Sequence, residues 1–395
     1  MYRLLHICFL SIILTCSCLA TDAAAMQTEA LEGTIAVDQK IEAILKELAD
    51  PADVPGVVAA IAKEGQPIRI AANGVRKSGS DRELRTSNVM HLGSCTKAVT
   101  ATLAGILIDQ GKLRFDSTIG DVLPELADDI APAYRSVTLY QCLTHTSGMP
   151  ANANDWWLNW RTRTTIQHKR LAIARDSLKA APQTEPGMGY NYSNLGYMVA
   201  GLMIERVTGQ SWEDNIRQHI FGPLDLKTAG FGVPGTRGAA TEPWGHRKSA
   251  DGSFASFQKD NAPALGPAGT LYMTLEDWSR FTLLANQGFL IAQGKELAQQ
   301  TKPAINLQPK TWKKLFETAH VNGKSTNYAC GWMLANRPWA QGTALTHAGS
   351  NTMWYCVAWT APETKTSYLV AMNVAGDGVS QIADQIASRL IQLDR

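Results

Sequence analysis

An apolar stretch at residues 91–111 constrains the fold more than any other part of the chain. Apolar side chains recur at helical spacing over residues 99–107, and Gly111 is a typical C-terminal stop. The pattern predicts a buried helix that begins at Ser94, with Lys97 one turn later on the same side. The rest of the chain is expected to be organised around this helix.

The pair Ser94 and Lys97 suits nucleophilic catalysis. A serine hydroxyl is a poor nucleophile at its free pKa, but a nearby amine with a lowered pKa can take its proton. The same two residues also fit a helix-capping serine followed by a solvated lysine. A second Ser-x-x-Lys, Ser256 to Lys259, has no apolar helix behind it and is predicted to be a surface loop.

Length and composition exclude several classes of protein. A chain of 395 residues allows one large domain or two closely packed ones. The net charge of +2 gives no indication of a nucleic-acid partner. The chain contains neither Cys-x-x-Cys nor His-Glu-x-x-His, so no metal site is predicted.

Residues 1–25 are predicted to be a secretory signal peptide outside the fold. An arginine precedes a short apolar run over residues 4–14, and small residues follow. This run is too short for a stable membrane span. Cleavage after Ala20 or Ala25 would satisfy the small-residue rule, and lipidation of Cys18 is a less favoured alternative. We therefore expect a periplasmic or secreted protein.

The cysteines beyond the signal peptide leave two alternatives open. Their wide spacing excludes a small disulfide scaffold. A bridge between Cys330 and Cys356 is conceivable in an exported protein, and four buried thiols are at least as well supported. The four residues are Cys95, Cys142, Cys330 and Cys356.

Patterns near both chain ends predict one antiparallel sheet. Residues 36–49 predict a helix, followed by a β-hairpin. The C-terminal part returns to strands and ends in an amphipathic helix. The predicted hairpin strands are 57–62 and 68–72, the later strands are 328–335, 354–360 and 367–373, and the last helix is 380–393.

We therefore predict an α+β fold with an inserted helical region. The sheet region comprises residues 31–92 and 262–395, and the mostly helical region comprises residues 93–261. The active site is expected between these two regions.

Two further motifs carry groups suited to acid–base chemistry. Tyr192-Ser-Asn194 is the only Tyr-x-Asn in the chain; the tyrosine, if close to a lysine, is expected to have a lowered pKa and to relay protons. His347-Ala-Gly349 places an imidazole beside a glycine where a ligand or another backbone comes close. Taken alone, the first motif fits better as a helix-capping Ser/Asn pair beside a packed tyrosine, and the second fits equally a satisfied histidine in a β-bulge. His91-Leu-Gly93 repeats the His-x-Gly spacing.

In this order the motifs resemble those of the serine penicillin-recognising family, which includes class C β-lactamases, serine D-Ala-D-Ala carboxypeptidases and related esterases. The resemblance rests on Ser94-Cys-Thr-Lys97, Tyr192-Ser-Asn194 and His347-Ala-Gly349. It covers roughly residues 37–393 and is reinforced by Leu143-Thr-His-Thr-Ser-Gly148 and Pro267-Ala-Gly-Thr-Leu-Tyr272.

The resemblance implies a role for each matched residue. Ser94 would be the acylated nucleophile and Lys97 the base or the holder of the proton network. Tyr192 would move the proton to the leaving group, and Asn194 would bind the substrate amide. His347 occupies the position usually held by lysine, beside Gly349, and the amides of Ser94 and Ser350 would form the oxyanion hole.

The resemblance also implies a function. We expect an exported serine hydrolase that works through an acyl-enzyme, without metal or organic cofactor, on a D-Ala peptide, a small ester or a β-lactam. Because His347 is charged only when protonated, the carboxypeptidase and esterase branches fit better than an efficient β-lactamase. The alternative is a penicillin-binding sensor that is acylated without turnover. The expected partner is a small-molecule or peptide substrate, and the oligomeric state is left open.

Three other features of the sequence have simple structural explanations. His145 is predicted to be a structural hydrogen-bonding residue. Trp156, Trp157 and Trp160 would line a pocket or simply pack. Cys95 is predicted to serve packing.

Overall fold

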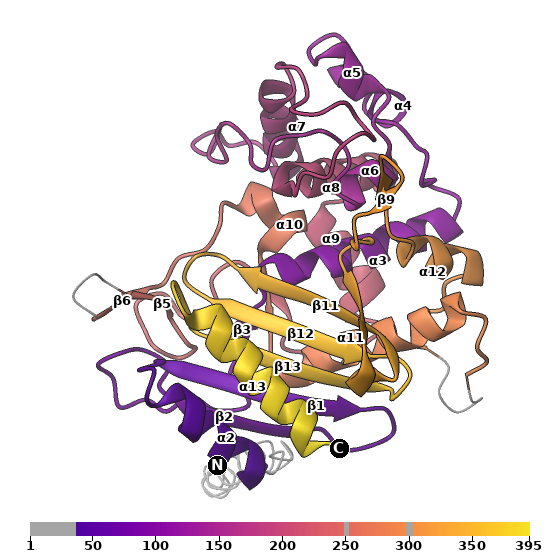
Figure 1. Ribbon diagram of the computed structural model, residues 1–395. Helices are drawn as coiled ribbons and strands as arrows, with labels where there is room; N and C mark the ends of the chain where they lie inside the picture. Colours follow the sequence, from indigo (N-terminus) through magenta and orange to yellow (C-terminus); the bar gives the residue numbers. More distant parts are fainter. Residues whose placement is uncertain (1–36, 249–252, 298–302) are drawn as a thin grey trace, which may run out of the picture. The chain divides into compact units, whose positions relative to one another are not determined.

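The computed structural model describes residues 37–248, 253–297 and 303–395 (Figure 1). The expected signal peptide, with its cleavage sites and Cys18, lies outside the described residues. The part from Val37 to Arg395 forms one compact unit. No helix in the described ranges is long and apolar enough to cross a bilayer.

A six-stranded sheet joins the two ends of the chain. Its order is β10-β11-β12-β13-β1-β2, and every neighbouring pair is antiparallel. Val57 of β1 lies opposite Met372 of β13, so the N-terminal hairpin extends the C-terminal strands. The predicted α+β fold is confirmed. The strands are β1 Gly56–Lys63, β2 Arg69–Gly74, β10 Met333–Arg337, β11 Gly342–Ser350, β12 Tyr355–Ala361 and β13 Thr366–Met372.

Helices cover both faces of this sheet. On one face, α2 (Gln39–Ala49) and α13 (Val379–Leu393) pack side by side against the strands, as Figure 1 shows. Ile41 and Ile386 from these helices join Val370 from β13 in one apolar core. The other face is covered by α11 (Leu275–Ala292), which contacts β1, β12 and β13. Because β1 and β13 are covered on both faces, their sequences are nearly continuous apolar runs.

The helix predicted around residue 100 lies at the centre of the remaining helices. Ser94 occupies a 3₁₀ turn, Gly93–Cys95, that leads directly into α3 (Thr96–Asp109), and nearly all residues of α3 are buried. It packs against α8, α10 and α12. The other helices are α4 Ile119–Val122, α5 Pro132–Arg135, α6 Leu139–Leu143, α7 Ile166–Ser177, α8 Asn194–Thr208, α9 Trp212–Ile216, α10 Gly266–Gly269 and α12 Pro309–Leu315.

Short strands link the helical part to the sheet. The prediction of a surface loop at Ser256 is wrong, because this residue lies in β6 (Phe254–Phe257), where it pairs with His246. The small sheets comprise β14 Val374–Ala375 with β5 Gly245–Lys248 and β6, then β3 Met90–His91 with β7 Leu271–Met273 and β4 Gly230–Phe231, and β8 His320–Val321 with β9 Lys324–Ser325.

The four cysteines beyond the expected signal peptide are buried thiols, the second of the two alternatives left open by the sequence. All four are buried free thiols, so the conceivable bridge between Cys330 and Cys356 is not formed. Cys356 instead lies against Cys95, with 3.6 Å between the sulfur atoms. Cys95 also donates a hydrogen bond to the carbonyl oxygen of His347 at 3.3 Å, so it does more than fill space.

Candidate active site

Ser94 lies at the edge of a cavity of about 700 Å³. It is held there by the turn before α3, in which Gly93 has a φ of +47°, a conformation that glycine adopts without strain. The preceding residue anchors the turn, because Leu92 donates its backbone N–H to the carbonyl oxygen of Leu271 at 2.8 Å. The hydroxyl of Ser94 is thus presented to a space large enough for a small substrate.

The amine of Lys97 is surrounded by three oxygen atoms. Its Nζ lies 3.1 Å from Ser94 Oγ, and it donates hydrogen bonds at 2.8 Å to Asn194 Oδ1 and at 2.8 Å to the carbonyl oxygen of Ala268. The side chain is completely buried. Burial lowers the pKa of Lys97 to about 7, although the neighbouring Cys95 opposes this shift. Near neutral pH the amine can therefore lose its proton and act as a base.

Tyr192 packs beside this amine. Its ring centroid lies 4.7 Å from Lys97 Nζ and 4.2 Å from the ring of His145. Burial raises the pKa of the Tyr192 hydroxyl, and an interaction with Ser94 lowers it only in part. The expected lowering of this pKa is therefore wrong, because desolvation outweighs the nearby amine. Tyr192 remains protonated and can donate a hydrogen bond.

His145 holds the loop that carries Tyr192. Its Nδ1 accepts a hydrogen bond from the backbone N–H of Ser193 at 3.0 Å. Burial lowers the pKa of His145 well below its usual value, so the imidazole is neutral. Ser193 in turn caps α8 by accepting from the N–H of Gly196 at 2.9 Å, which places Asn194 at the first turn of that helix. His145 thus occupies a structural position, as its sequence context indicates.

His347 faces Tyr328, a tyrosine outside the three motifs. It is 6% exposed, with Nδ1 2.6 Å from the carbonyl oxygen of Ala348 and Nε2 3.1 Å from the hydroxyl of Tyr328. Because a carbonyl oxygen only accepts, Nδ1 carries a proton and Nε2 is left to accept from Tyr328. His347 does not line the cavity, and its ring lies 6.5 Å from that of Tyr192. His347 thus lies behind the catalytic group, next to Tyr192 and Tyr328.

Gly93 and Gly349 allow two backbone segments to touch. A Cβ atom on Gly349 would lie 2.0 Å from the carbonyl oxygen of Leu92 and 2.9 Å from the nitrogen of Ser94. A Cβ atom on Gly93 would lie 2.4 Å from the nitrogen of Ser350. The contact brings the amides of Ser94 and Ser350 to one edge of the cavity, which both residues line.

Gly349→Ala tests this contact. The added methyl group has no room, so we expect a loss of about 1–3 kcal/mol in the free energy of unfolding. We also expect the rate of Ser94 acylation to fall at least about 10-fold, because displacement of reacting groups by about 1 Å is costly. Gly222→Ala is the matched control, since its Cβ would meet only ordinary contacts. Unchanged stability and acylation in Gly349→Ala would contradict the close contact.

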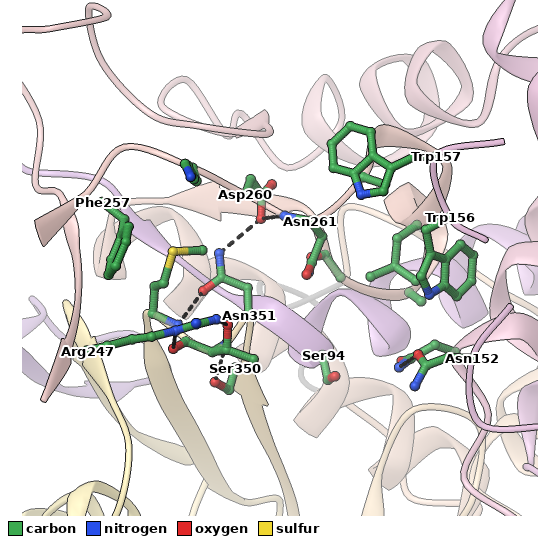
Figure 2. Close-up of a pocket in the computed structure, with 18 residues that line it drawn as sticks. Ser94, Asn152, Trp156, Trp157, Arg247, Phe257, Asp260, Asn261, Ser350 and Asn351 are labelled. Atoms are coloured by element: carbon green, nitrogen blue, oxygen red, sulfur yellow. Dashed lines mark hydrogen bonds between the residues drawn. The ribbon is translucent and has the colours of Figure 1, made fainter. Parts of the chain in front are cut away.

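The cavity has two chemically different walls. Figure 2 shows Trp156, Trp157 and Asn152 on one side of Ser94 and Arg247 and Phe257 on the other. Trp157 is 49% exposed and packs edge-on against Trp160, which is exposed and does not line the cavity.

The cationic wall was not anticipated. Arg247 lies there with Nε donating to the carbonyl oxygen of Thr352 at 2.9 Å. Lys259, from the second Ser-x-x-Lys, also lines the cavity. Arg247 stands in no motif, and the motif that holds Lys259 was expected to be a surface loop. Across the described ranges, no group of three or more His, Cys, Asp or Glu side chains is arranged to hold a metal ion.

Comparisons with known proteins agree on one family. The family described as "Beta-lactamase" matches residues 37–392. "Penicillin-binding protein 4" of Amycolatopsis lactamdurans is 35% identical over 173 residues, which cover 44% of this chain and 44% of that protein. "Esterase EstB" of Burkholderia gladioli is 29% identical over 49% of this chain and 51% of the esterase. The chain's match thus spans less than two thirds of either relative.

A solved structure shows the same fold over most of the chain. The D-amino acid amidase from Ochrobactrum anthropi SV3, complexed with L-phenylalanine amide, superposes with a TM-score of 0.69 and 22% identity. The superposition covers 90% of this chain and 99% of that one. At this level of identity the likeness concerns the fold alone.

Proposed function

Because the chain belongs to the beta-lactamase family, we propose that it is a serine hydrolase that cleaves amide or ester substrates through an acyl-enzyme on Ser94. The resemblance read from the motifs is confirmed by the family match. One observation carries the proposal: Ser94 Oγ lies 3.1 Å from a fully buried amine. The pKa of that amine, Lys97, is lowered to about 7, so it can serve as a general base.

The contacts of Lys97 suit proton transfer from Ser94. A neutral amine has two N–H groups and one lone pair, and the two N–H groups are used by Asn194 and the carbonyl oxygen of Ala268. The lone pair is then left for the hydroxyl proton of Ser94. Oγ attacks the substrate carbonyl carbon as this proton moves to Nζ. The amides of Ser94 and Ser350 would stabilise the oxyanion, and the N-terminus of α3 adds a positive end.

Completion of the cycle requires a proton for the leaving group. Protonated Lys97 is the proton source beside Ser94, and the neutral hydroxyl of Tyr192 can relay that proton by giving its own to the leaving group and taking one from Lys97. The C–N or C–O bond of the tetrahedral intermediate breaks as the proton is delivered, and the acyl group stays on Oγ. In the second half, water gives one proton to the neutral amine of Lys97 and its oxygen to the acyl carbon. The acyl C–Oγ bond then breaks as Lys97 returns that proton to Oγ, which releases the acid and restores Ser94.

The walls of the cavity bear on the choice of substrate. His347 is not among the residues that line the cavity. Arg247 and Lys259 are the basic side chains that reach the cavity, and a substrate carboxylate would lie on their side. D-Ala peptides and small esters remain better candidates than β-lactams that are turned over rapidly. Export to the periplasm or medium is part of the proposal and rests on the N-terminal sequence.

The proposal is tested by intact mass. The protein is mixed with a penicillin, and separately with a p-nitrophenyl acyl ester, and sampled from seconds to hours. A short-lived adduct on Ser94 with released product is expected for at least one compound. A lasting penicillin adduct without turnover would favour the sensor instead. Neither adduct nor product with esters, D-Ala peptides and penicillins would contradict the proposed function.

A further inference from the structure

Asp260 connects the parts of the backbone that carry the two oxyanion amides. It follows β6 and lines the cavity, yet its side chain is only 3% exposed. Oδ1 accepts hydrogen bonds from the backbone N–H of Asn261 at 2.6 Å and from Asn351 Nδ2 at 3.0 Å, as Figure 2 shows. Oδ2 has no hydrogen-bond partner among the described residues. A carboxylate is costly to bury, so its position calls for an explanation.

The first connection runs through His91 to the nucleophile. His91 is 1% exposed, and its Nε2 lies 2.7 Å from Asp260 Oδ1, at ion-pair length although without hydrogen-bond direction. Its Nδ1 accepts the backbone N–H of Gly93 at 3.0 Å. Because Nδ1 accepts, the ring proton of a neutral imidazole is on Nε2, the atom that lies beside the carboxylate. The negative charge of Asp260 at 2.7 Å favours this tautomer, and the tautomer in turn holds Gly93, the residue before Ser94.

The second connection runs through Asn351 to the other amide. Asn351 turns its NH₂ group toward Asp260, so its Oδ1 faces the following turn. That oxygen accepts the backbone N–H groups of Met353 at 3.2 Å and Trp354 at 3.1 Å. The amide orientation set by Asp260 thus fixes the turn that begins after Ser350.

We propose that Asp260 is a positioning residue that holds the Ser94 and Ser350 amides at the separation needed to bind an oxyanion. This inference rests on the proposed acyl-transfer function. Asp260 touches neither reacting atom; it acts through His91 and Asn351. The neighbouring residue Asn261 makes a third connection, because its Nδ2 donates a hydrogen bond to the carbonyl oxygen of Gly269 at 2.8 Å. Gly269 follows Ala268, whose carbonyl oxygen accepts from Lys97.

Three variants separate positioning from general stability. Asp260→Ala removes the shared acceptor, and we expect kcat to fall about 100-fold, the scale of losing one oxyanion donor, with KM changed less than about threefold. Asp260→Asn keeps an oxygen at the Oδ1 position and is expected to retain kcat within about fivefold. Asp277→Ala is the matched control, since Asp277 is a 4% exposed carboxylate that accepts from Thr228 N and Oγ1 and does not line the cavity. It should lose thermal stability while the folded protein keeps its kcat.

Hydrogen exchange supplies a readout that does not need turnover. Amides in residues 91–95 and 350–354 should exchange faster in Asp260→Ala than in the wild-type protein, and should be unaffected in Asp277→Ala. If the wild-type protein shows neither hydrolysis nor Ser94 acylation, the proposed function fails. The exchange pattern then still shows whether Asp260 holds these two backbone segments in place.

Several results would overturn the inference. The inference fails if amide exchange in residues 91–95 and 350–354 of Asp260→Ala equals that of the wild-type protein. It also fails if the kcat of Asp260→Ala stays within about threefold of wild type. A loss of kcat in Asp277→Ala equal to that in Asp260→Ala would show only a stability effect. If Asp260→Ala fails to fold, Asn351→Leu is the deciding variant. It removes the hydrogen bond between Asn351 and Asp260 and should lower kcat about 10-fold. An unchanged kcat would contradict the positioning role of Asp260.

Discussion

Replacement of Ser94 with alanine is expected to lower kcat by at least about 10⁴-fold, because removal of a nucleophile abolishes the covalent route and leaves only binding and oxyanion stabilisation. The substitution removes one oxygen atom from the edge of the cavity and leaves α3 intact. Unfolding temperature should therefore change little. The measurement is steady-state hydrolysis of the best ester or peptide substrate, together with intact mass to follow the acyl adduct.

Ser256→Ala is the control for this experiment. Ser256 stands in the second Ser-x-x-Lys of the chain but lies in β6 and does not line the cavity. Its variant should hydrolyse substrate at the wild-type rate. Retained acyl transfer in a folded Ser94→Ala protein would rule out Ser94 as the nucleophile and with it the proposed mechanism.

Replacement of Lys97 with methionine should lower kcat about 10³-fold, within the range measured for general bases. Methionine fills the same buried space without an amine, so the loss reflects the missing proton acceptor. Lys112→Met is the matched control, because Lys112 is exposed beyond the end of α3 and should be dispensable. A Lys97→Met protein with wild-type acylation kinetics would assign the base to another group.

The pH profile reports the same amine. Burial lowers the pKa of Lys97 to about 7, and the base is the deprotonated form. In the wild-type protein kcat/KM should therefore rise with pH through about 7 and level off above it. The residual activity of Lys97→Met should lack this inflection. A wild-type profile that is flat between pH 6 and 8 would contradict a titrating Lys97.

The parts of the site that lie on one local motif could be predicted. The spacing of Ser94 and Lys97 on a helix fixes their proximity, and the pattern of apolar runs at both chain ends predicts the sheet. Strand β11 was not predicted as a whole, because its small and polar residues lack an alternating apolar pattern. The strand expected at residues 328–335 is observed only as β10, Met333–Arg337, because Tyr328 forms only an isolated bridge with Met333.

Contacts between distant segments could not be predicted from the sequence. Asp260 meets His91 and Asn351 only once the chain has folded, and no spacing links these residues. The pKa of Tyr192 was misjudged for the same reason. A nearby lysine is suggested by the motifs, but the depth of burial that raises this pKa depends on the packed rings of His145 and other side chains.

The pairing of β1 with β13 has a consequence for the order in which the protein folds. These two neighbouring strands are separated by almost the whole described chain, with Val57 opposite Met372. Contacts so distant in sequence close slowly, and synthesis makes the N-terminal strand first. We therefore expect the early hairpin to wait with one apolar edge unpaired until the last strands appear. During that interval the newly made chain is most exposed to aggregation, and a chaperone that shields this edge would raise the yield of folded protein.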